Sequence, residues 1–238
     1  MDLNSPLEIS KYFLATLSTQ VNCYYQERIP DRGSILVVSN HRSLMDAPIL
    51  MKALSAPIRF ACHHYMGQVP LLRDIITNQL GCFPLEANSS RQGSFFQRSQ
   101  TLLQSEEIVG VFPEGTAPMV KFTTPNQVGK FQRGFAHLAL RAEVTDLAVL
   151  PVAIVSLEEM STSGLPLKIF SLFDPSEPLF NQSGLHPVVV YRRVAVLIGK
   201  PYWITPERRQ QYQGKQVKKV VSELTEYSRS QIYNLIHH

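Results

Sequence analysis

Short apolar runs bounded by turn-forming residues are the feature that most limits what this chain can fold into. Residues 35–38 read Ile-Leu-Val-Val, just after the turn-forming sequence Asp-Arg-Gly at 31–33. A short run without alternating polar residues is typical of a strand that is buried on both faces. Comparable runs predict further strands at 58–62, 81–85, 108–112, 147–155, 166–173, 188–192 and 194–198.

Helical patterns separate many of these strands. They predict helices at 94–104, at 131–142, and from the Thr-Pro-Glu cap at 205–207 to about residue 235. Strands that alternate with helices indicate an α/β fold, in which a largely parallel or mixed sheet is flanked by helices. Residues 159–187, which concentrate Ser, Gly and Pro, are predicted to be a loop within a single domain.

The N-terminal segment, residues 1–30, is predicted to hold an amphipathic helix at 7–25. Its apolar residues recur every four positions, at Ile9, Phe13, Leu17 and Val21. This spacing puts them on one face of a helix, which either packs on the main domain, residues 31–238, or faces a membrane. The polar face of this helix has few Lys or Arg residues, which weakens the membrane interpretation.

Composition and missing motifs exclude several classes of protein. With 44% hydrophobic and 18% charged residues, the chain is too apolar to be disordered. It lacks GxGxxG, GxxxxGK(S/T), GxSxG and HExxH, so a nucleotide-binding loop, a nucleophile-elbow hydrolase and a zinc peptidase are not expected. The basic residues between 208 and 219 form either a solvated face or a contact for lipid headgroups or an acidic carrier protein. Tyr212 is the single aromatic residue interleaved with them, so nucleic acid is not an expected partner.

The chain is expected to lie in the cytoplasm, with the option of binding a membrane surface. Its longest apolar run, at 147–155, is far shorter than the roughly 20 residues that cross a bilayer. The N-terminus lacks the basic start of a signal peptide. Three widely spaced cysteines, with no CxxC pair, favour a reducing compartment. The net charge of +4 permits an anionic ligand or lipid surface without requiring one.

A histidine and an aspartate follow the first buried strand, in the sequence Ser-Asn-His-Arg-Ser-Leu-Met-Asp at 39–46. Ligands of open α/β sheets bind at the carboxyl ends of strands, so His41 is a candidate base and Asp46 its orienting partner. Five residues along one straight helix leave a net rotation of about 140°. The two side chains therefore meet only if His41 lies in the turn before a helix that carries Asp46. Alternatively, Asp46 caps a helix and the backbone satisfies His41.

A second polar group follows the predicted strand at 108–112, in the sequence Pro-Glu-Gly-Thr at 113–116. Backbone N–H groups around Gly115 and Thr116 are placed to face an anion or a developing oxyanion. The alternative is an ordinary Pro-Glu-Gly turn. The sequence therefore predicts a second half of a site at the same edge of the sheet.

These two sequences together resemble a known family. Asn-His-x-Ser-x-x-Asp at 40–46, followed by Phe-Pro-Glu-Gly-Thr at 112–116, is similar to the motifs of the glycerolipid acyltransferases, which include the 1-acylglycerol-3-phosphate acyltransferases. Further similar stretches lie at 81–86, 131–136 and 150–153. The resemblance covers about residues 34–156 and implies a glycerol-3-phosphate acyltransferase-like α/β fold, with an acyltransferase domain at 31–238.

The resemblance implies acyl transfer from an acyl thioester, acyl-CoA or acyl carrier protein, to a hydroxyl of a lysophospholipid, with 1-acylglycerol-3-phosphate as the leading acceptor. His41 would be the general base and Asp46 its partner. Glu114, Gly115 and Thr116 would bind the acceptor, and Ser43 would shape the turn. No metal or other cofactor is implied, and the partner surface would be a membrane approached peripherally.

Two cations of the family pattern are missing. Where the second motif usually ends in Asp-Arg, this chain has Glu86 and Ala87, and the third motif continues Thr-Ala-Pro instead of Thr-Arg-Ser. A phosphate normally needs paired Arg or Lys side chains. The charge is therefore expected from Arg42, Arg91, Lys130 and Arg133. Otherwise the acceptor carries no phosphate, as in a glycolipid or lyso-aminolipid, or the chain binds a lipid or acyl carrier without turnover.

Overall fold

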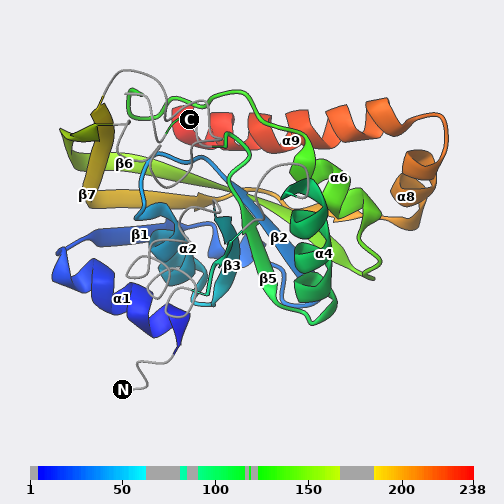
Figure 1. The fold of residues 1–238 in the computed structure, drawn as a ribbon, viewed down its shortest axis with the longest axis horizontal. Helices are drawn as coiled ribbons and strands as arrows, with labels where there is room; N and C mark the ends of the chain where they lie inside the picture. The colour runs from blue at the N-terminus through cyan, green and yellow to red at the C-terminus, as the bar shows by residue number, and fades with distance from the viewer. Residues whose placement is uncertain (1–4, 63–80, 85–90, 116–117, 119–122, 167–184) are drawn as a thin grey trace.

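The computed structural model describes residues 5–62, 81–84, 91–115, 118, 123–166 and 185–238, and its strands form one sheet (Figure 1). The strand order is β1-β7-β6-β2-β5-β3-β4, and β8 pairs with β6 outside this path. The strands are β1 (Gln20–Tyr24), β2 (Ser34–Ser39), β3 (Ile58–Cys62), β4 (Phe83–Pro84), β5 (Ile108–Val111), β6 (Leu147–Pro166), β7 (Leu185–Ile198) and β8 (Tyr202–Ile204). The helices are α1 (Pro6–Thr16), the short 3-10 helix η1 (Gln26–Arg28), α2 (Asp46–Leu54), α4 (Arg91–Gln104), α6 (Gly134–Arg141), α8 (Pro206–Gln213) and α9 (Val217–His237).

Parallel pairing at the centre of the sheet brings the carboxyl ends of several strands to one edge. β2 pairs in parallel with both β5 and β6, and β3 pairs in parallel with β5. β1 is parallel to β7, whereas β7 and β8 run antiparallel to β6. The predicted fold class, α/β with a largely parallel or mixed sheet flanked by helices, is therefore confirmed.

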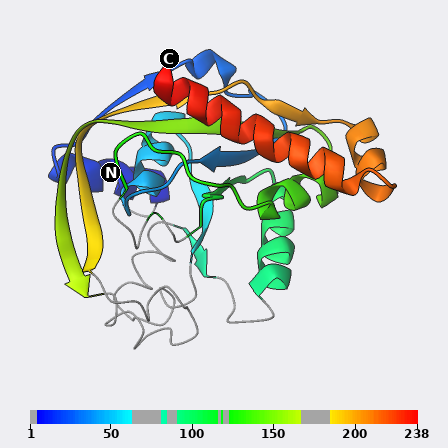
Figure 2. The same ribbon diagram turned by 90° about the horizontal axis from the view of Figure 1, so that it is seen from above.

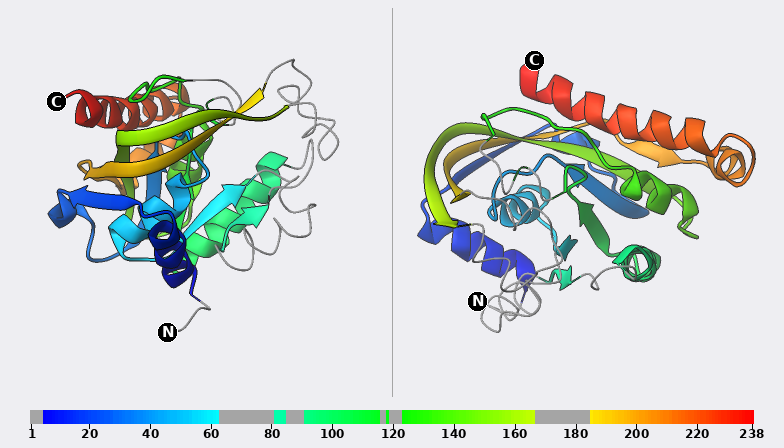
Figure 3. Two further views of the ribbon diagram at one scale, coloured as in Figure 1. Left: turned by 90° about the vertical axis from the view of Figure 1, so that its left-hand side faces the viewer. Right: turned by 45° about the horizontal axis from the view of Figure 1, so that its top comes forward.

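Helices cover both faces of this sheet (Figure 3). Ile35 and Val37 of β2 join the apolar core with α1 and α2, whereas Leu36 and Val38 join the core with α4, α6 and α9. Successive side chains of a strand point to opposite faces, and both faces are covered here, which explains why residues 35–38 of β2 are all apolar. Each buried aliphatic side chain contributes about 1.5–3 kcal/mol. The end of β2 is thereby a rigid base for the residues that follow it.

The prediction of a helix over 7–25 is wrong in its second half. Helix α1 ends at Thr16, the chain turns at Ser18 with φ 54°, and residues 20–24 form β1 beside β7. The pairing with β7 supplies backbone hydrogen bonds that an isolated helical pattern does not reveal. The buried face of α1 also differs from the predicted one, because Ser10 and Leu14 are buried and Phe13 is 39% exposed.

The prediction of a loop over 159–187 is wrong at both ends. β6 continues to Pro166 and β7 begins at Leu185, and the two strands lie side by side as an antiparallel arm that curves away from the sheet (Figure 2). We call residues 156–166 and 185–194 the arm. Ser and Gly favour turns locally, but pairing between distant strands outweighs that preference here. Residues 167–184, with most of the predicted strand 166–173, lie outside the described residues.

Other boundaries differ more modestly. The predicted strands 188–192 and 194–198 are one strand, β7, and the helix predicted from residue 131 begins at Gly134. The last predicted helix is two helices, because α8 ends before Gly214 and α9 begins at Val217. Within the described ranges, no helix combines the length and the apolar composition that a bilayer span needs.

Gly110 of β5 provides the first testable point. A Cβ atom at this position would fall inside contact distance of the Phe60 ring. We therefore expect Gly110→Ala to lower the free energy of unfolding by about 1–3 kcal/mol, since overpacking forces neighbouring side chains to move. Urea denaturation of the purified variant measures this change.

Gly93 in α4 is the matched control, because a Cβ there meets nothing within 4 Å. Gly93→Ala should stabilise the protein by up to about 1 kcal/mol, as expected for an exposed helical glycine. Equal denaturation midpoints for Gly110→Ala and the unmodified protein would contradict the packing of Phe60 over Gly110.

Candidate active site

His41 and Asp46 meet in the turn that leaves the central strand. β2 ends at Ser39, α2 begins at Asp46, and His41 lies between them. His41 Nδ1 is 2.8 Å from Asp46 Oδ2. This is the arrangement that the five-residue spacing requires for the two side chains to meet. Asp46 is buried, whereas 17% of the imidazole surface is exposed.

One carboxylate oxygen organises the whole turn. Besides His41, Asp46 Oδ2 accepts the backbone N–H groups of Arg42 at 2.7 Å and Ser43 at 2.8 Å. An ionised carboxylate can only accept hydrogen bonds, so the proton between the two side chains belongs to Nδ1. The other ring nitrogen, Nε2, then carries a lone pair that can take a proton from a substrate hydroxyl.

Two stacked phenylalanine rings pack behind one face of the imidazole. The His41 ring stacks on Phe112 with centroids 4.1 Å apart and planes 13° apart, and Phe112 stacks on Phe60 at 4.9 Å and 7°. His41 and Phe112 follow the carboxyl ends of β2 and β5, and Phe60 lies within β3, which pairs with β5. The stack fixes the plane of the imidazole, while Asp46 fixes its rotation within that plane.

Glu114 connects the histidine turn to a second loop. Its carboxylate accepts the backbone N–H of His41 at 3.3 Å and that of Gly129 at 2.7 Å. The Gly129 carbonyl in turn accepts from Arg229 Nε of α9 at 3.1 Å. Burial raises the pKa of Glu114, and the two backbone N–H groups act against that rise. The described contacts of Glu114 are thus structural, and acceptor binding by this residue stays a prediction.

Gly115 adopts a conformation that suits glycine. Its φ is 70°, in the left-handed region, and an added Cβ would lie 2.7 Å from Gln132 Nε2. Its N–H donates to the Phe112 carbonyl at 3.0 Å, which closes the predicted turn. Thr116, also predicted to bind the acceptor, lies outside the described residues.

Arg42 is held inside the protein by an acidic partner. Its Nη1 and Nη2 donate to the Glu159 carboxylate at 2.9 and 3.1 Å, and Nε and Nη2 donate to Thr123. Burial acts to lower the pKa of Arg42, but the hydrogen bonds that it donates to Glu159 and the nearby negative charges raise that pKa overall. An acceptor phosphate at Arg42 would therefore compete with Glu159.

The other predicted residues lie in different surroundings. Ser43 Oγ donates to the Val189 carbonyl at 2.7 Å, which fits a role in shaping the turn. Lys130 and Arg133 are exposed and flank the buried Phe131 before α6. Arg91 begins α4, but its side chain is outside the described part. The structure thus brings together His41, Arg42, Ser43, Asp46 and Glu114.

The sequence does not predict the roles of several site residues. Asn40 is only a member of the motif at 40–46, yet its side chain holds Ile154 through a reciprocal pair of hydrogen bonds of 2.9 and 2.8 Å. Phe60 and Glu159 lie outside any motif. Their only sequence signals are an aromatic residue in a strand and a carboxylate beyond the recognised region, and neither predicts a contact with the turn.

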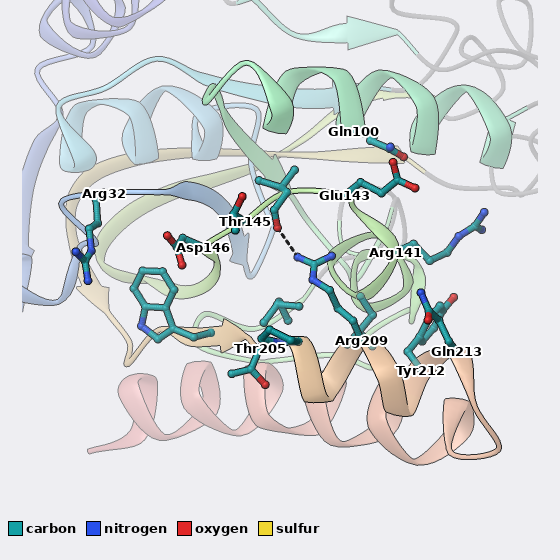
Figure 4. Close-up of a pocket in the computed structure, with 15 residues that line it drawn as sticks. Arg32, Gln100, Arg141, Glu143, Thr145, Asp146, Thr205, Arg209, Tyr212 and Gln213 are labelled. Carbon is teal, nitrogen blue, oxygen red and sulfur yellow. Dashed lines mark hydrogen bonds between the residues drawn. The ribbon is translucent and has the colours of Figure 1, made fainter.

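A separate cleft of about 880 Å³ lies at the other end of the sheet (Figure 4). Its lining includes Arg32 before β2 and Asp146 before β6, so it is distant from the carboxyl ends where His41 lies. Arg209 within it donates to the carbonyls of Ala142 and Val144. Among the residues that the structure describes, no cluster of His, Cys, Asp and Glu is arranged to hold a metal.

Comparison with known proteins now identifies the family. The model of the family described as Acyltransferase matches residues 20–155, which is more than half of the chain. The chain belongs to this acyltransferase family. The matched region contains both halves of the site, from the His41 turn through Glu114.

Individual relatives of this family member are distant. A protein named probable 1-acyl-sn-glycerol-3-phosphate acyltransferase from Mycoplasma genitalium is 28% identical over 144 residues, 58% of this chain and 50% of that protein. An uncharacterized protein of Mycobacterium leprae is 28% identical over 193 residues, 75% of this chain and 50% of its own length. The chain thus spans about half the length of these relatives.

A solved structure supports the fold. The crystal structure of the 1-acyl-sn-glycerophosphate (LPA) acyltransferase PlsC from Thermotoga maritima aligns with a TM-score of 0.59. The alignment covers 99% of this chain and 78% of the other, with 19% sequence identity. At that identity the likeness shows a shared α/β fold.

The aromatic stack gives a second prediction. Phe112→Leu keeps an apolar side chain but removes the flat surface under His41, so kcat for the acyl transfer that the family membership leads us to expect should fall about tenfold. Phe112→Tyr keeps the ring and should retain most of that activity. The rate at saturating substrates measures both variants, and equal kcat values for them would contradict a positioning role of the ring.

Proposed function

We propose that this chain transfers a fatty acyl group from an acyl thioester to the hydroxyl of a lysophospholipid, with 1-acylglycerol-3-phosphate as the first acceptor to test. The observation that carries this proposal is the 2.8 Å contact of His41 Nδ1 with Asp46, which leaves Nε2 as a base at the carboxyl edge of the sheet. Membership of the acyltransferase family supports the reaction class, and the names of two relatives from Mycoplasma support the acceptor.

In the proposed reaction His41 acts as general base. Nε2 removes the proton of the acceptor hydroxyl as its oxygen attacks the thioester carbonyl, and Asp46 stabilises the imidazolium that forms. The new C–O bond replaces the C–S bond, and the leaving thiolate takes up the proton from His41. The products are the ester and a free thiol, so no acyl-enzyme is needed.

The proposed donor is acyl-CoA or acyl carrier protein. Each serves as co-substrate, and no separate cofactor is proposed for the chemistry. We propose that Gly115 and Thr116 help to bind the acceptor. Glu114 orders the turn that carries His41, because its carboxylate accepts the backbone N–H of His41. Ser43 shapes this turn through its bond to Val189.

A second candidate is the same transfer to an acceptor without a phosphate, such as a glycolipid or lyso-aminolipid. The Arg42–Glu159 pair favours it, because that guanidinium already has a bidentate carboxylate partner. A phosphate would instead rely on Lys130 and Arg133, both exposed, and on Arg91. The phosphate acceptor remains the first candidate because two relatives are named as probable 1-acyl-sn-glycerol-3-phosphate acyltransferases.

We further propose a membrane surface as the place where the acceptor is met. Exposed apolar and aromatic side chains support this on two parts of the chain. They are Tyr12 and Phe13 of α1, and Leu44 in the turn between β2 and α2, residues 40–45, which we call the catalytic turn. Such side chains favour the boundary between water and lipid when they lie on one surface. A cytoplasmic location remains the expectation from the cysteine content.

Removal of the proposed base gives the third prediction. His41→Ala should lower thioester-dependent transfer by about 10²–10⁴-fold, and Asp46→Asn should also lower it strongly by disturbing the ring tautomer. The measurement is ester formation with free-thiol release, beside a thermal unfolding curve for each variant. A well-folded His41→Ala protein that consumes thioester at the normal rate would overturn the proposed mechanism.

An acceptor panel gives the fourth prediction. Lysophosphatidic acid, lysophosphatidylcholine and uncharged acceptors are compared with both acyl-CoA and acyl carrier protein donors. We expect the highest kcat/KM with lysophosphatidic acid, and a loss of that preference in an Arg133→Gln, Lys130→Gln variant. Activity confined to uncharged acceptors would refute the phosphate acceptor and favour the second candidate.

A further inference from the structure

The arm changes the direction of its side chains through two β-bulges. On β6, Ser156 pairs with Val194 and Glu158 pairs with Arg193, so the β6 strand gains one residue at Leu157. On β7, Glu159 then pairs directly with Tyr191, so the β7 strand gains one residue at Arg192. An extra residue in a strand reverses which face the following side chains occupy.

The two bulges change which positions of β6 and β7 face the core. Before the bulges, even-numbered positions such as Ile154 of β6 and Val196 of β7 pack in the core with α1 and α2. Beyond them, odd-numbered Val189 and Tyr191 of β7 occupy that core, and odd-numbered Glu159 of β6 contacts Arg42. Both bulges are needed for Glu159 and Tyr191 to face the catalytic turn together.

The arm contacts the turn at successive residues. Glu159 binds the Arg42 guanidinium, and both side chains are largely buried, with 6% of Arg42 and 13% of Glu159 exposed. The Val189 carbonyl accepts from Ser43 Oγ, and the Tyr191 N–H donates to Met45 Sδ at 3.3 Å. Because the Arg42 and Ser43 N–H groups bind Asp46, these contacts act on the hydrogen bonds that hold the carboxylate.

Tyr191 is a buried tyrosine that interacts with the same carboxylate. Its side chain is buried, and burial together with the negative charge of Asp46 raises its pKa well above the usual value. The phenol is therefore a neutral hydrogen-bond donor. Asp46 Oδ1, the oxygen that does not face His41, is buried and receives no hydrogen bond in the part of the chain that the structure describes.

We propose that Glu159 and Tyr191 are positioning residues for the acyl transfer, acting on His41 through Asp46. Glu159 fixes Arg42, and thereby the Arg42 N–H on Asp46 Oδ2. The buried Tyr191 hydroxyl is the donor for Asp46 Oδ1, which has no other partner among the described residues. This inference rests on the proposed function. A buried ion pair often adds little net stability, so its value here lies in the orientation of the groups attached to it.

The kinetic test compares neighbouring carboxylates and two tyrosines. Glu159→Gln and Tyr191→Phe should each lower kcat about tenfold or more, with KM for the thioester within about twofold, because substrate binding is not touched. The matched controls are Glu158→Gln, an exposed carboxylate on the same strand, and Tyr233→Phe, an exposed tyrosine of α9. Both controls should keep the unmodified kcat.

A spectroscopic measurement separates positioning from activity. The His41 Nδ1–H proton that binds Asp46 should give a proton NMR resonance that disappears in Asp46→Asn. Glu159→Gln and Tyr191→Phe should shift this resonance, and the two controls should not. Tyr191→Phe removes only a hydroxyl, so it remains informative if Glu159→Gln unfolds because Arg42 loses its partner.

The outcomes distinguish the two proposals. If the unmodified protein performs no transfer, the proposed function fails, and the resonance still decides whether Glu159 and Tyr191 position His41. If the protein is active and Tyr191→Phe keeps both kcat and the resonance, the positioning role of Tyr191 is overturned. If folded Glu159→Gln loses no more kcat than Glu158→Gln and keeps the resonance, the role of Glu159 is overturned. A rise in KM at constant kcat would also contradict positioning, because it would indicate a part in substrate binding.

Discussion

The hydrogen bonds to one oxygen, Asp46 Oδ2, are the constraint on which the rest of the site depends. That oxygen accepts from the imidazole of His41 and from two successive backbone N–H groups. The turn after β2 can therefore take one shape only if the carboxylate stays in place. The surrounding contacts, from Glu114, from the phenylalanine stack and from the arm, hold the pieces of this turn from different directions. A base that is fixed in position before substrate arrives loses little entropy in the reaction.

The sequence predicted the part of the fold that depends on local pattern. The apolar run at 35–38 correctly indicated a doubly buried strand, and the spacing of His41 and Asp46 correctly indicated a turn followed by a helix if the two were to meet. The resemblance to an acyltransferase family is confirmed by the family match. These inferences succeeded because the relevant residues are close in sequence and their side chains alternate regularly.

The remaining features depend on contacts between distant segments. β1 was mistaken for a helix because its hydrogen-bond partner, β7, is about 170 residues away along the chain. Arg42 was expected to be free for a phosphate because nothing near it in the sequence identifies Glu159 as its partner. Phe60 enters the site through two neighbouring strands, and its place over Gly110 is a property of their register. Local propensity carries no information on such pairings.

The two bulges of the arm also define how this region can change. Side chains of a regular strand alternate with a period of two, so the two extra residues decide which residue numbers face the turn. Regular pairing of the same sequence, with Leu157 opposite Arg193 and Glu158 opposite Arg192, would turn both Glu159 and Tyr191 away from the turn. Deleting Leu157 and Arg192 would instead remove the bulges and leave Glu159 paired with Tyr191 on the inner face. The two bulges therefore act as a pair of spacers that set the phase of both strands. The orientation of Glu159 and Tyr191 depends on this shared register, even though no catalytic motif lies there.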